Sequence, residues 1–237
     1  MTPAKSIAET LPDGVVLIDK PAHMTSFGVV ARLRRALGDI AAEAIDPRPA
    51  KRPKIKVGHT GTLDPFATGL MILVVGKQCR NAQLYSKLDK VYEATIRLGE
   101  VSTTGDPEGE ITKMSPMSSP TVAQVQAVLK RFTGAIEQTP PAFSAIKING
   151  QRAYKLARQG EAVEMPSRTI TVHSLELLSY NFPELQVRAH VSSGTYIRTL
   201  AEDIGQALGT GAYCSQLRRT RVAQYDVANA LVLPADQ

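Results

Sequence analysis

One short segment, Gly58–Gly69, contains three glycines, a histidine and an aspartate. Its sequence is Gly-His-Thr-Gly-Thr-Leu-Asp-Pro-Phe-Ala-Thr-Gly. The residue before a proline is restricted to extended backbone, so Asp64, which precedes Pro65, is held in a fixed direction, as a nucleophile or general base must be. The same pattern also fits a structural role, in which Asp64 caps a single helical turn, Pro65 takes its first position and Gly69 ends it. Both interpretations can hold together.

A metal centre is not predicted from this segment. His59 has no second histidine or cysteine at ligand spacing, and the two cysteines, Cys79 and Cys214, form no Cys-x-x-Cys pair. So few cysteines also argue against a disulfide framework, and a reducing cytoplasm is the expected compartment.

The composition is that of a globular protein. The chain has 237 residues, of which 43% are hydrophobic and 21% are charged, which excludes a disordered chain and suffices for a sizeable core. The longest apolar run, Leu70–Val75, is far too short to cross a bilayer, and Met1–Asp13 lacks the apolar core of a signal peptide. We therefore expect a soluble, unexported protein with no membrane partner.

Basic residues exceed acidic residues, 28 against 22, which gives a formal net charge of +6. Five of the cations fall between Arg48 and Lys56 with no acidic residue among them. Such a basic arm favours contact with the phosphates of a nucleic acid, although a solvated loop has the same pattern.

The pattern of apolar residues predicts a mixed α/β protein. We expect strands over 14–18, 69–75, 91–98 and 185–191, and helices over 26–38, 77–88, 121–133 and 196–208. The first helix should be capped by Ser26 and ended by Gly38, and Thr121 with Gln124 forms a capping box. Asn149-Gly150 indicates a hairpin.

Five motifs in a fixed order resemble those of the TruB family of tRNA pseudouridine synthases. Besides Gly58–Gly69, they are Val16–Pro21, Asp89–Tyr92 (Asp-Lys-Val-Tyr), Ser144–Lys147 (Ser-Ala-Ile-Lys) and Gly194–Arg198 (Gly-Thr-Tyr-Ile-Arg). Together they are far more specific than any one alone. The resemblance implies a single catalytic domain over 1–237, with a mixed, largely antiparallel sheet flanked by helices.

The resemblance gives Asp64 the role of the family's essential aspartate. Pseudouridine formation breaks the bond between ribose C1′ and uracil N1, turns the base and rejoins it through C5, so one carboxylate can suffice without metal or cofactor. Addition to the sugar, addition to the base and removal of a ribose proton remain open as routes.

Two further catalytic residues follow from the resemblance. Tyr92 matches the active-site tyrosine that stacks on the target base and can take the C5 proton, with an aromatic residue on a buried strand face as the alternative. Arg198 matches the arginine that pairs with the catalytic aspartate, with a solvated arginine as the alternative. Its spacing places it in the first turn of a helix, where the helix dipole disfavours a cation unless a carboxylate offsets it.

Three residues match substrate-binding positions of the family, and a fourth lies in one of its motifs. Lys20 matches a basic group near the active site, and His59 matches the histidine that supports the RNA loop from which target nucleotides leave the stack. Leu217 matches a residue lining the uracil pocket, and Tyr196 can help to shape that wall. The competing interpretation is a surface ion pair for Lys20 and a satisfied, partly buried histidine for His59. For Leu217 and Tyr196 it is ordinary core packing.

A thumb-like insertion, about 140–165, resembles the family segment that closes over the RNA loop, and its Lys147 and Arg158 suit phosphate contacts. A plain solvated helix face is the alternative. The basic loop 39–57 is longer than the resemblance leads us to expect, so no role is carried over to it. Phe143 stands where tyrosine is common. We expect no C-terminal PUA domain.

The implied function is isomerisation of uridine at position 55 in the T loop of tRNA, by a cytoplasmic enzyme that flips out its target base and uses no cofactor. Its partner would be the T arm of tRNA, with no guide RNA and no obligate protein partner. The alternative is an RNA-binding or tRNA-folding protein whose role does not depend on catalysis, which the basic arm and the thumb would serve equally well.

Overall fold

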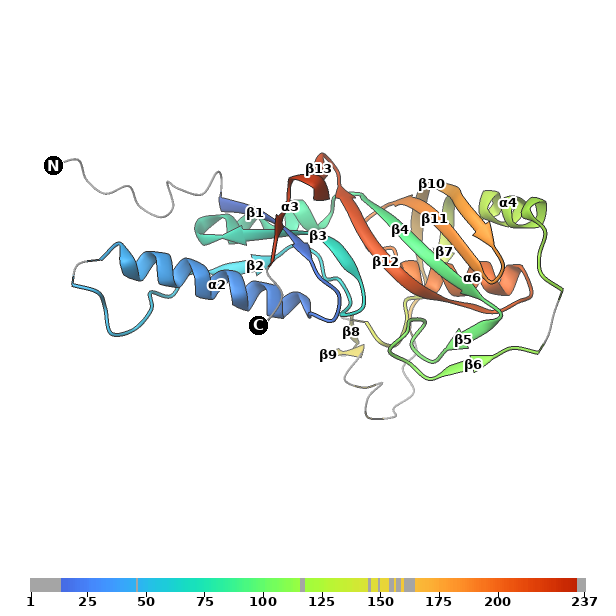
Figure 1. Cartoon of the computed structure of the whole chain (residues 1–237), viewed down its shortest axis with the longest axis horizontal. Helices are drawn as coiled ribbons and strands as arrows, with labels where there is room; N and C mark the ends of the chain where they lie inside the picture. Colours follow the sequence, from blue (N-terminus) through green and yellow to red (C-terminus); the bar gives the residue numbers. More distant parts are fainter. Residues whose placement is uncertain are drawn as a thin grey trace. The chain divides into compact units, whose positions relative to one another are not determined.

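A computed structural model describes residues 14–45, 47–115, 118–144, 146–148, 150–153, 156, 159 and 165–233. The chain divides into two compact units, Met1–Leu88 with Arg218–Gln237, and Asp89–Leu217. Each unit combines strands with helices (Figure 1), which confirms the mixed α/β class. The expectation of one catalytic domain over 1–237 stays a prediction.

The strands of the first unit are grouped around β3. They are β1 (Val15–Lys20), β2 (Val57–His59), β3 (Thr68–Val75), the last part of β12 (Ala212–Val222), β13 (Tyr225–Asp226) and β14 (Leu231–Val232). β1 and β2 pair with β3 antiparallel, while β12 pairs with β3 in parallel at Arg218 and Arg219. β1 and β3 confirm the two strands that their apolar runs predict.

The helix that follows β1 differs from the prediction at both ends. α2 (Ser26–Glu43) is capped by Thr25, whose hydroxyl accepts a first-turn N–H at 3.0 Å, so the predicted cap at Ser26 is wrong. The predicted end at Gly38 is also wrong. A Cβ at the buried Gly38 would lie 3.3 Å from the carbonyl oxygen of Pro53, so packing against the returning chain outweighs the helical cost of glycine, about 1 kcal/mol.

The helix expected over 77–88 consists of two short pieces, a 3-10 helix, η2 (Gly76–Asn81), and α3 (Ala82–Ser86). Neither piece contains a fully buried residue, and Tyr85 alone among their aromatic residues packs against the buried cluster of Leu70, Ile72 and Val222, so the apolar face is too small to hold a longer helix in place. The Gln78 side-chain amide donates to the Tyr85 hydroxyl at 2.6 Å and links the two pieces.

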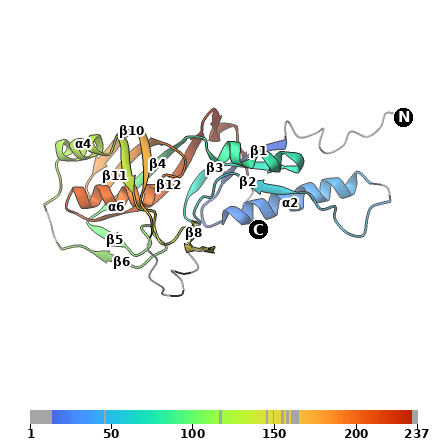
Figure 2. The same cartoon turned by 180° about the vertical axis from the view of Figure 1, so that it is seen from behind.

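The second unit is a sheet in which β4, β11, β10 and β7 are neighbours in that order, all paired antiparallel. The strands are β4 (Lys90–Leu98), β7 (Gly134–Gln138), β10 (Arg168–Asn181) and β11 (Glu184–Val191), with the first part of β12 beside β4. α6 (Ile197–Ala207) lies across one face (Figure 2), and α4 (Val122–Arg131) packs against β10. Neither of these helices, nor any other in the described ranges, is long and apolar enough to cross a membrane.

Several predictions for this unit are confirmed. β4, β11 and α6 lie where the sequence places them, and α4 begins with the predicted capping box of Thr121 and Gln124. The strand β10 is missing from the sequence prediction. Its register shifts after Val172 and again after Leu177, and each shift disturbs the alternation by which a strand is recognised.

Two small hairpins project from the second unit. β5 (Glu100–Ser102) pairs with β6 (Ile111–Lys113), and the loop expected over 102–109 connects them. β8 (Lys147–Ile148) pairs with β9 (Gln151–Arg152), which confirms the hairpin predicted from Asn149-Gly150. Much of the remaining thumb segment, including Arg158, lies outside the described residues.

Candidate active site

The segment that carries Asp64 connects β2 to β3 without forming a helix. The predicted helical turn ending at Gly69 is therefore wrong, and the carbonyl of Asp64 instead accepts the N–H of Ala67 at 3.1 Å in an isolated turn. Gly69 lies inside β3 with a φ of +105°, and a Cβ there would stand 2.3 Å from the carbonyl oxygen of Arg219. The close approach of β12, not the end of a helix, requires this glycine.

Ser26, at the start of α2, holds the loop immediately before Asp64. Its hydroxyl donates to the carbonyl of Leu63 and accepts the N–H of the same residue, both at 2.8 Å. Both residues are buried, so water cannot replace these bonds if the hydroxyl is lost. Ser26 thus fixes the backbone next to the carboxylate instead of capping a helix.

Lys20 holds the loop immediately after Asp64. Its side chain is fully buried, and its ammonium donates to three carbonyl oxygens at 2.7 to 3.1 Å, one of which belongs to Pro65. The N–H of His23 donates to the same Pro65 oxygen at 2.8 Å. Lys20 therefore lies beside the candidate catalytic loop and ties the turn after β1 to it.

Arg219 braces the beginning of the same loop from β12. Its guanidinium is buried, with Nε donating to the carbonyl of Leu70 at 2.7 Å. The other two nitrogens donate to the carbonyls of Gly61 and Thr62 at 3.2 and 3.4 Å. Three buried polar side chains from three different elements thus hold this one loop.

The result is a half-buried aspartate whose neighbouring backbone is fixed. Asp64 lies between Leu63, bonded through both its N–H and its carbonyl, and Pro65, whose carbonyl accepts two donors. Because the backbone on both sides of Asp64 is held, the direction of its Cα–Cβ bond is set before a substrate arrives, so less ordering entropy is lost on binding. Such a carboxylate suits either nucleophilic or general-base chemistry.

Arg198 lies in the first turn of α6, as predicted, and is almost completely buried. Its Nη1 donates to Asp106 Oδ2 at 2.9 Å and to the carbonyl of Thr104 at 2.8 Å. Its Nη2 donates to the carbonyl of Phe143 at 2.9 Å, a contact that does not depend on whether residue 143 is phenylalanine or tyrosine. The predicted pairing of Arg198 with Asp64 stays a prediction.

Asp106 supplies the carboxylate that a cation at the start of a helix needs. It is buried, and its other oxygen, Oδ1, accepts the Thr104 hydroxyl at 2.6 Å and the N–H of Glu108 at 3.0 Å. A buried ion pair is stable only when its remaining hydrogen-bonding atoms are satisfied in this way. Arg198 and Asp106 therefore form one ordered unit.

Glu202 follows Arg198 by one turn of α6 and lies against the loop that carries Asp106. A Cβ on Gly105 would stand 2.6 Å from its carboxylate, which shows how closely the loop packs on it. It also lines a cleft of about 450 Å³ with Val101 and Met114. Desolvation raises the pKa of Glu202 to about 7, although the charge of Arg198 lowers it.

Tyr196 is the N-cap residue of α6, and its backbone is held by Gln138 of β7. The Tyr196 N–H donates to Gln138 Oε1 at 2.8 Å, and Gln138 Nε2 donates to the Tyr196 carbonyl at 3.0 Å. The guanidinium of Arg168 lies 5.2 Å from the centre of the tyrosine ring. The backbone of Tyr196 is thus held by Gln138, and its ring is contacted by Arg168, at the start of the helix that carries Arg198.

Tyr92 and Leu217, the two predicted pocket residues on strands, are both buried. Tyr92 lies on the buried face of β4, opposite Ala189 of β11, and Leu217 lies in β12. These positions agree with a pocket wall and equally with core packing, so both roles stay predictions.

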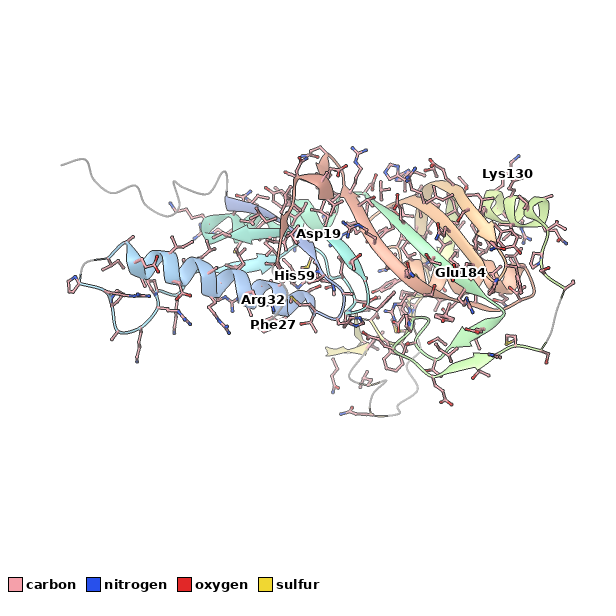
Figure 3. All side chains as sticks on the ribbon, viewed as in Figure 1. Asp19, Phe27, Arg32, His59, Lys130 and Glu184 are labelled. Atoms are coloured by element: carbon pink, nitrogen blue, oxygen red, sulfur yellow. The ribbon has the colours of Figure 1, made fainter. Side chains whose placement is uncertain are left out.

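Of the predicted RNA contacts, His59 is the last residue of β2, half-buried and in register with Leu73 (Figure 3). The first unit thus gathers Lys20, His59 and Asp64 around one loop. Lys147 begins β8, and Arg158 lies outside the described residues.

Four polar residues that support these groups were not predicted as site residues: Ser26, Asp106, Gln138 and Arg219. All are buried, where an unpaired polar group is costly, so each has a structural partner. Arg219 has a weak signal in the sequence, since it closely follows the predicted pocket residue Leu217. The partners of the others lie 37 to 92 residues away in the sequence, too far for a local pattern to indicate them.

Curated proteins are similar in sequence to most of this chain. A protein named tRNA pseudouridine synthase B from Thermobifida fusca is 44% identical over 231 residues, covering 94% of this chain and 74% of the relative. A protein of the same name from Opitutus terrae is 45% identical over 223 residues, covering 94% of this chain and 86% of the relative.

Solved structures support the same fold. A crystal structure of a Cbf5-Nop10-Gar1 complex contains a chain that matches with a TM-score of 0.70 and 28% identity, over 97% of this chain and 55% of that chain. A structure of an H/ACA RNP bound to a substrate RNA containing 2′-deoxyuridine matches with a TM-score of 0.66 and 26% identity, over 96% and 53%. The present chain spans about half the length of these solved chains.

Two family models cover the chain from the basic arm onward. The model for the TruB family pseudouridylate synthase N-terminal domain matches residues 48–197, and the model for the tRNA pseudouridylate synthase B C-terminal domain matches residues 198–234. The candidate loop around Asp64 falls in the first match, and Arg198 begins the second. The chain belongs to the TruB family of pseudouridylate synthases.

Proposed function

We propose that this protein converts uridine to pseudouridine at position 55 in the T loop of tRNA, with Asp64 as the reacting carboxylate. The relatives named tRNA pseudouridine synthase B support tRNA as the substrate. The observation that carries the role of Asp64 is the pair of buried clamps around it, with Ser26 bonded to Leu63 and Lys20 bonded to Pro65.

The chemistry requires a group that acts on a uridine removed from the base stack. Asp64 either adds to the ribose or the base, or removes a ribose proton, while the bond from C1′ to N1 breaks. After the base has turned, C5 bonds to C1′ while any bond to Asp64 breaks or the ribose proton returns. C5 then loses its proton and N1 gains one, so the net change is an isomerisation. Tyr92 stacks on the base and can take the C5 proton, and Arg198 holds the charge of the carboxylate.

RNA recognition is assigned mainly to the T arm. His59 supports the opened loop, Tyr196 and Leu217 line the uracil pocket, and Lys147 and Arg158 of the thumb contact phosphates. With these contacts the enzyme needs neither a guide RNA nor an obligate protein partner, and we expect it in the cytoplasm.

The basic arm supplies a further electrostatic contact in this proposal. The arm folds back along α2, where Arg52 pairs with Asp39, and Arg34 donates to the carbonyl of Val57 at 3.2 Å. The remaining cations of the arm, including Lys51 and Lys54, are exposed. Exposed cations that release counterions from RNA give affinity that falls as salt rises.

The test is to incubate the purified chain alone with unmodified tRNA transcript and to map pseudouridine by position. Product at position 55 is expected, and product at another position, or none, would refute the proposal. The Asp64→Asn variant should form no pseudouridine yet bind tRNA within about tenfold of wild type, about 1.4 kcal/mol. Glu43→Gln, at the exposed last residue of α2, is the control for loss of a carboxylate charge and should retain activity.

The same variant separates catalysis from the alternative, an RNA-binding or tRNA-folding protein. Full turnover by Asp64→Asn would reduce Asp64 to a structural residue. The names of the relatives favour a catalyst.

A further inference from the structure

Two of the chain's four histidines lie side by side in the second unit, next to a carboxylate. His173 of β10 and His190 of β11 have ring centres 4.7 Å apart. Nε2 of His173 lies 3.1 Å from Oδ2 of Asp89, the residue before β4. One ligand atom from each of the three lies within 4.8 Å of the others. None of the three has a role in the function proposed above.

The sheet places these residues together by its register. β11 lies between β4 and β10, and His190 is opposite Val91 on one side and Ser174 on the other. The register of β10 shifts between Val172 and Ser174, so His173 is the extra residue of a bulge. A bulge changes the direction of a side chain, and here it lets His173 contact the ring of His190.

We propose that Asp89, His173 and His190 bind a divalent transition-metal ion of the zinc type. Imidazole nitrogens with a carboxylate suit zinc, cobalt or nickel better than magnesium or calcium, which prefer oxygen ligands. Zinc bonds of about 2.0–2.2 Å place tetrahedral ligand atoms roughly 3.3–3.6 Å apart. The ligand atoms of the three side chains must therefore move about 1 Å closer together, which needs only small side-chain rotations. The side chains of His173 and Asp89 are 38% and 44% exposed, which permits such rotations.

The charge around the cluster favours a cation. One row further along the same face, Arg188 pairs with Glu93 at 2.9 Å and with Glu176 at 3.5 Å, so two carboxylates share one guanidinium. This row is about 7 Å from His190, close enough for its net negative charge to act on a bound ion. The partial exposure of the cluster leaves solvent to complete the coordination.

A bound ion would add a link between Asp89, just before β4, and the strands β10 and β11. These strands are already joined by backbone pairing. Because these ligands come together only in the folded chain, binding should stabilise the native state. The link is made three residues before Tyr92, but no step of the proposed reaction uses it.

The test is a calorimetric titration of the full, tag-free chain with zinc chloride after treatment with a chelator. One zinc per chain is expected, with a rise in Tm of a few degrees that the chelator reverses. His173→Ala and His190→Ala should each weaken binding at least about tenfold, about 1.4 kcal/mol. The control His23→Asn removes an exposed histidine from a residue with a φ of 62°, which asparagine tolerates, and should bind zinc like wild type.

A second control addresses the partly exposed thiol of Cys79. Cys79→Ser should bind zinc unchanged, and the cobalt-loaded protein should lack thiolate charge-transfer absorption. Zinc binding that survives both histidine variants, or disappears in Cys79→Ser, overturns the proposal. If His190→Ala fails to fold by circular dichroism, His190→Gln provides the same comparison.

The two proposals fail separately. A chain that forms pseudouridine but binds no zinc overturns the metal site alone. A chain that binds zinc through both histidines but forms no pseudouridine overturns the proposed function alone.

Discussion

Replacing Glu202 with glutamine removes a carboxyl that the fold favours in its protonated form. Desolvation raises the pKa of Glu202 from its ordinary value of 4.5 to about 7, with Arg198 opposing the rise and the charges of Asp203 and Asp106 adding to it. The native state therefore binds this proton more tightly than the unfolded chain does. The resulting stabilisation is complete below about pH 4.5 and is lost as the pH rises through about 7.

The magnitude follows from the pKa difference between the two states. The step from 4.5 to about 7 corresponds to about 3.4 kcal/mol, at 1.36 kcal/mol per pH unit. Because Glu202 is only half-buried, solvent screening reduces the effect to about 1–2 kcal/mol. Glutamine has nearly the same shape without the charge. Glu202→Gln should thus be more stable than wild type by about 1–2 kcal/mol at pH 8.5, and should differ little at pH 5.

The assay is urea denaturation of both proteins at pH 5 and pH 8.5, followed by circular dichroism because the chain has no tryptophan. Glu43→Gln, at the exposed last residue of α2, is the control and should follow wild type at both pH values. Equal stability of Glu202→Gln and wild type at pH 8.5, or a less stable variant there, would refute the reasoning.

Three further predictions concern activity. Ser26→Ala should lower kcat more than it raises KM and reduce the free energy of unfolding by about 1–3 kcal/mol, because Leu63 loses a buried partner; an unchanged kcat would separate this clamp from Asp64. Arg198→Ala should lower kcat far more than tRNA affinity, and Arg198→Lys should not restore it because lysine lacks the planar fork; a loss confined to affinity would place Arg198 in the binding surface. An isolated T-arm hairpin should nearly match whole tRNA in kcat/KM, with any advantage of whole tRNA fading as salt rises. A preference above about a hundredfold, about 2.7 kcal/mol, that survives high salt would contradict this.

The features that the sequence predicts are those whose cause lies within a short window. The apolar runs of β1 and β3, the capping box at Thr121 and the alternation of β11 are each complete within a dozen residues. The Asp64 motif is also local. The resemblance could therefore identify the loop, although it could not show how the loop is held.

The features that the sequence does not predict depend on distant partners. Gly38 looks like a helix end until the packing of Pro53 against it is known, and Asp106 looks like an ordinary loop residue until Arg198, 92 residues away, is placed beside it. Ser26 likewise has the pattern of a cap, yet its partner lies 37 residues further on. The role of a polar residue that tertiary contacts bury depends on a partner far away in the sequence. A local sequence pattern cannot identify that partner.

The position of Gly69 has a consequence for mutagenesis libraries and for selection on this protein. Every side chain larger than a hydrogen atom would collide there with the backbone of β12, whatever the RNA and whatever the chemistry. Substitutions at Gly69 should therefore disappear from a library as unfolded protein, whereas substitutions at Asp64 should persist as folded but inactive protein. Abundance and turnover, scored separately, would distinguish a glycine that the sheet requires from an aspartate that the proposed reaction requires.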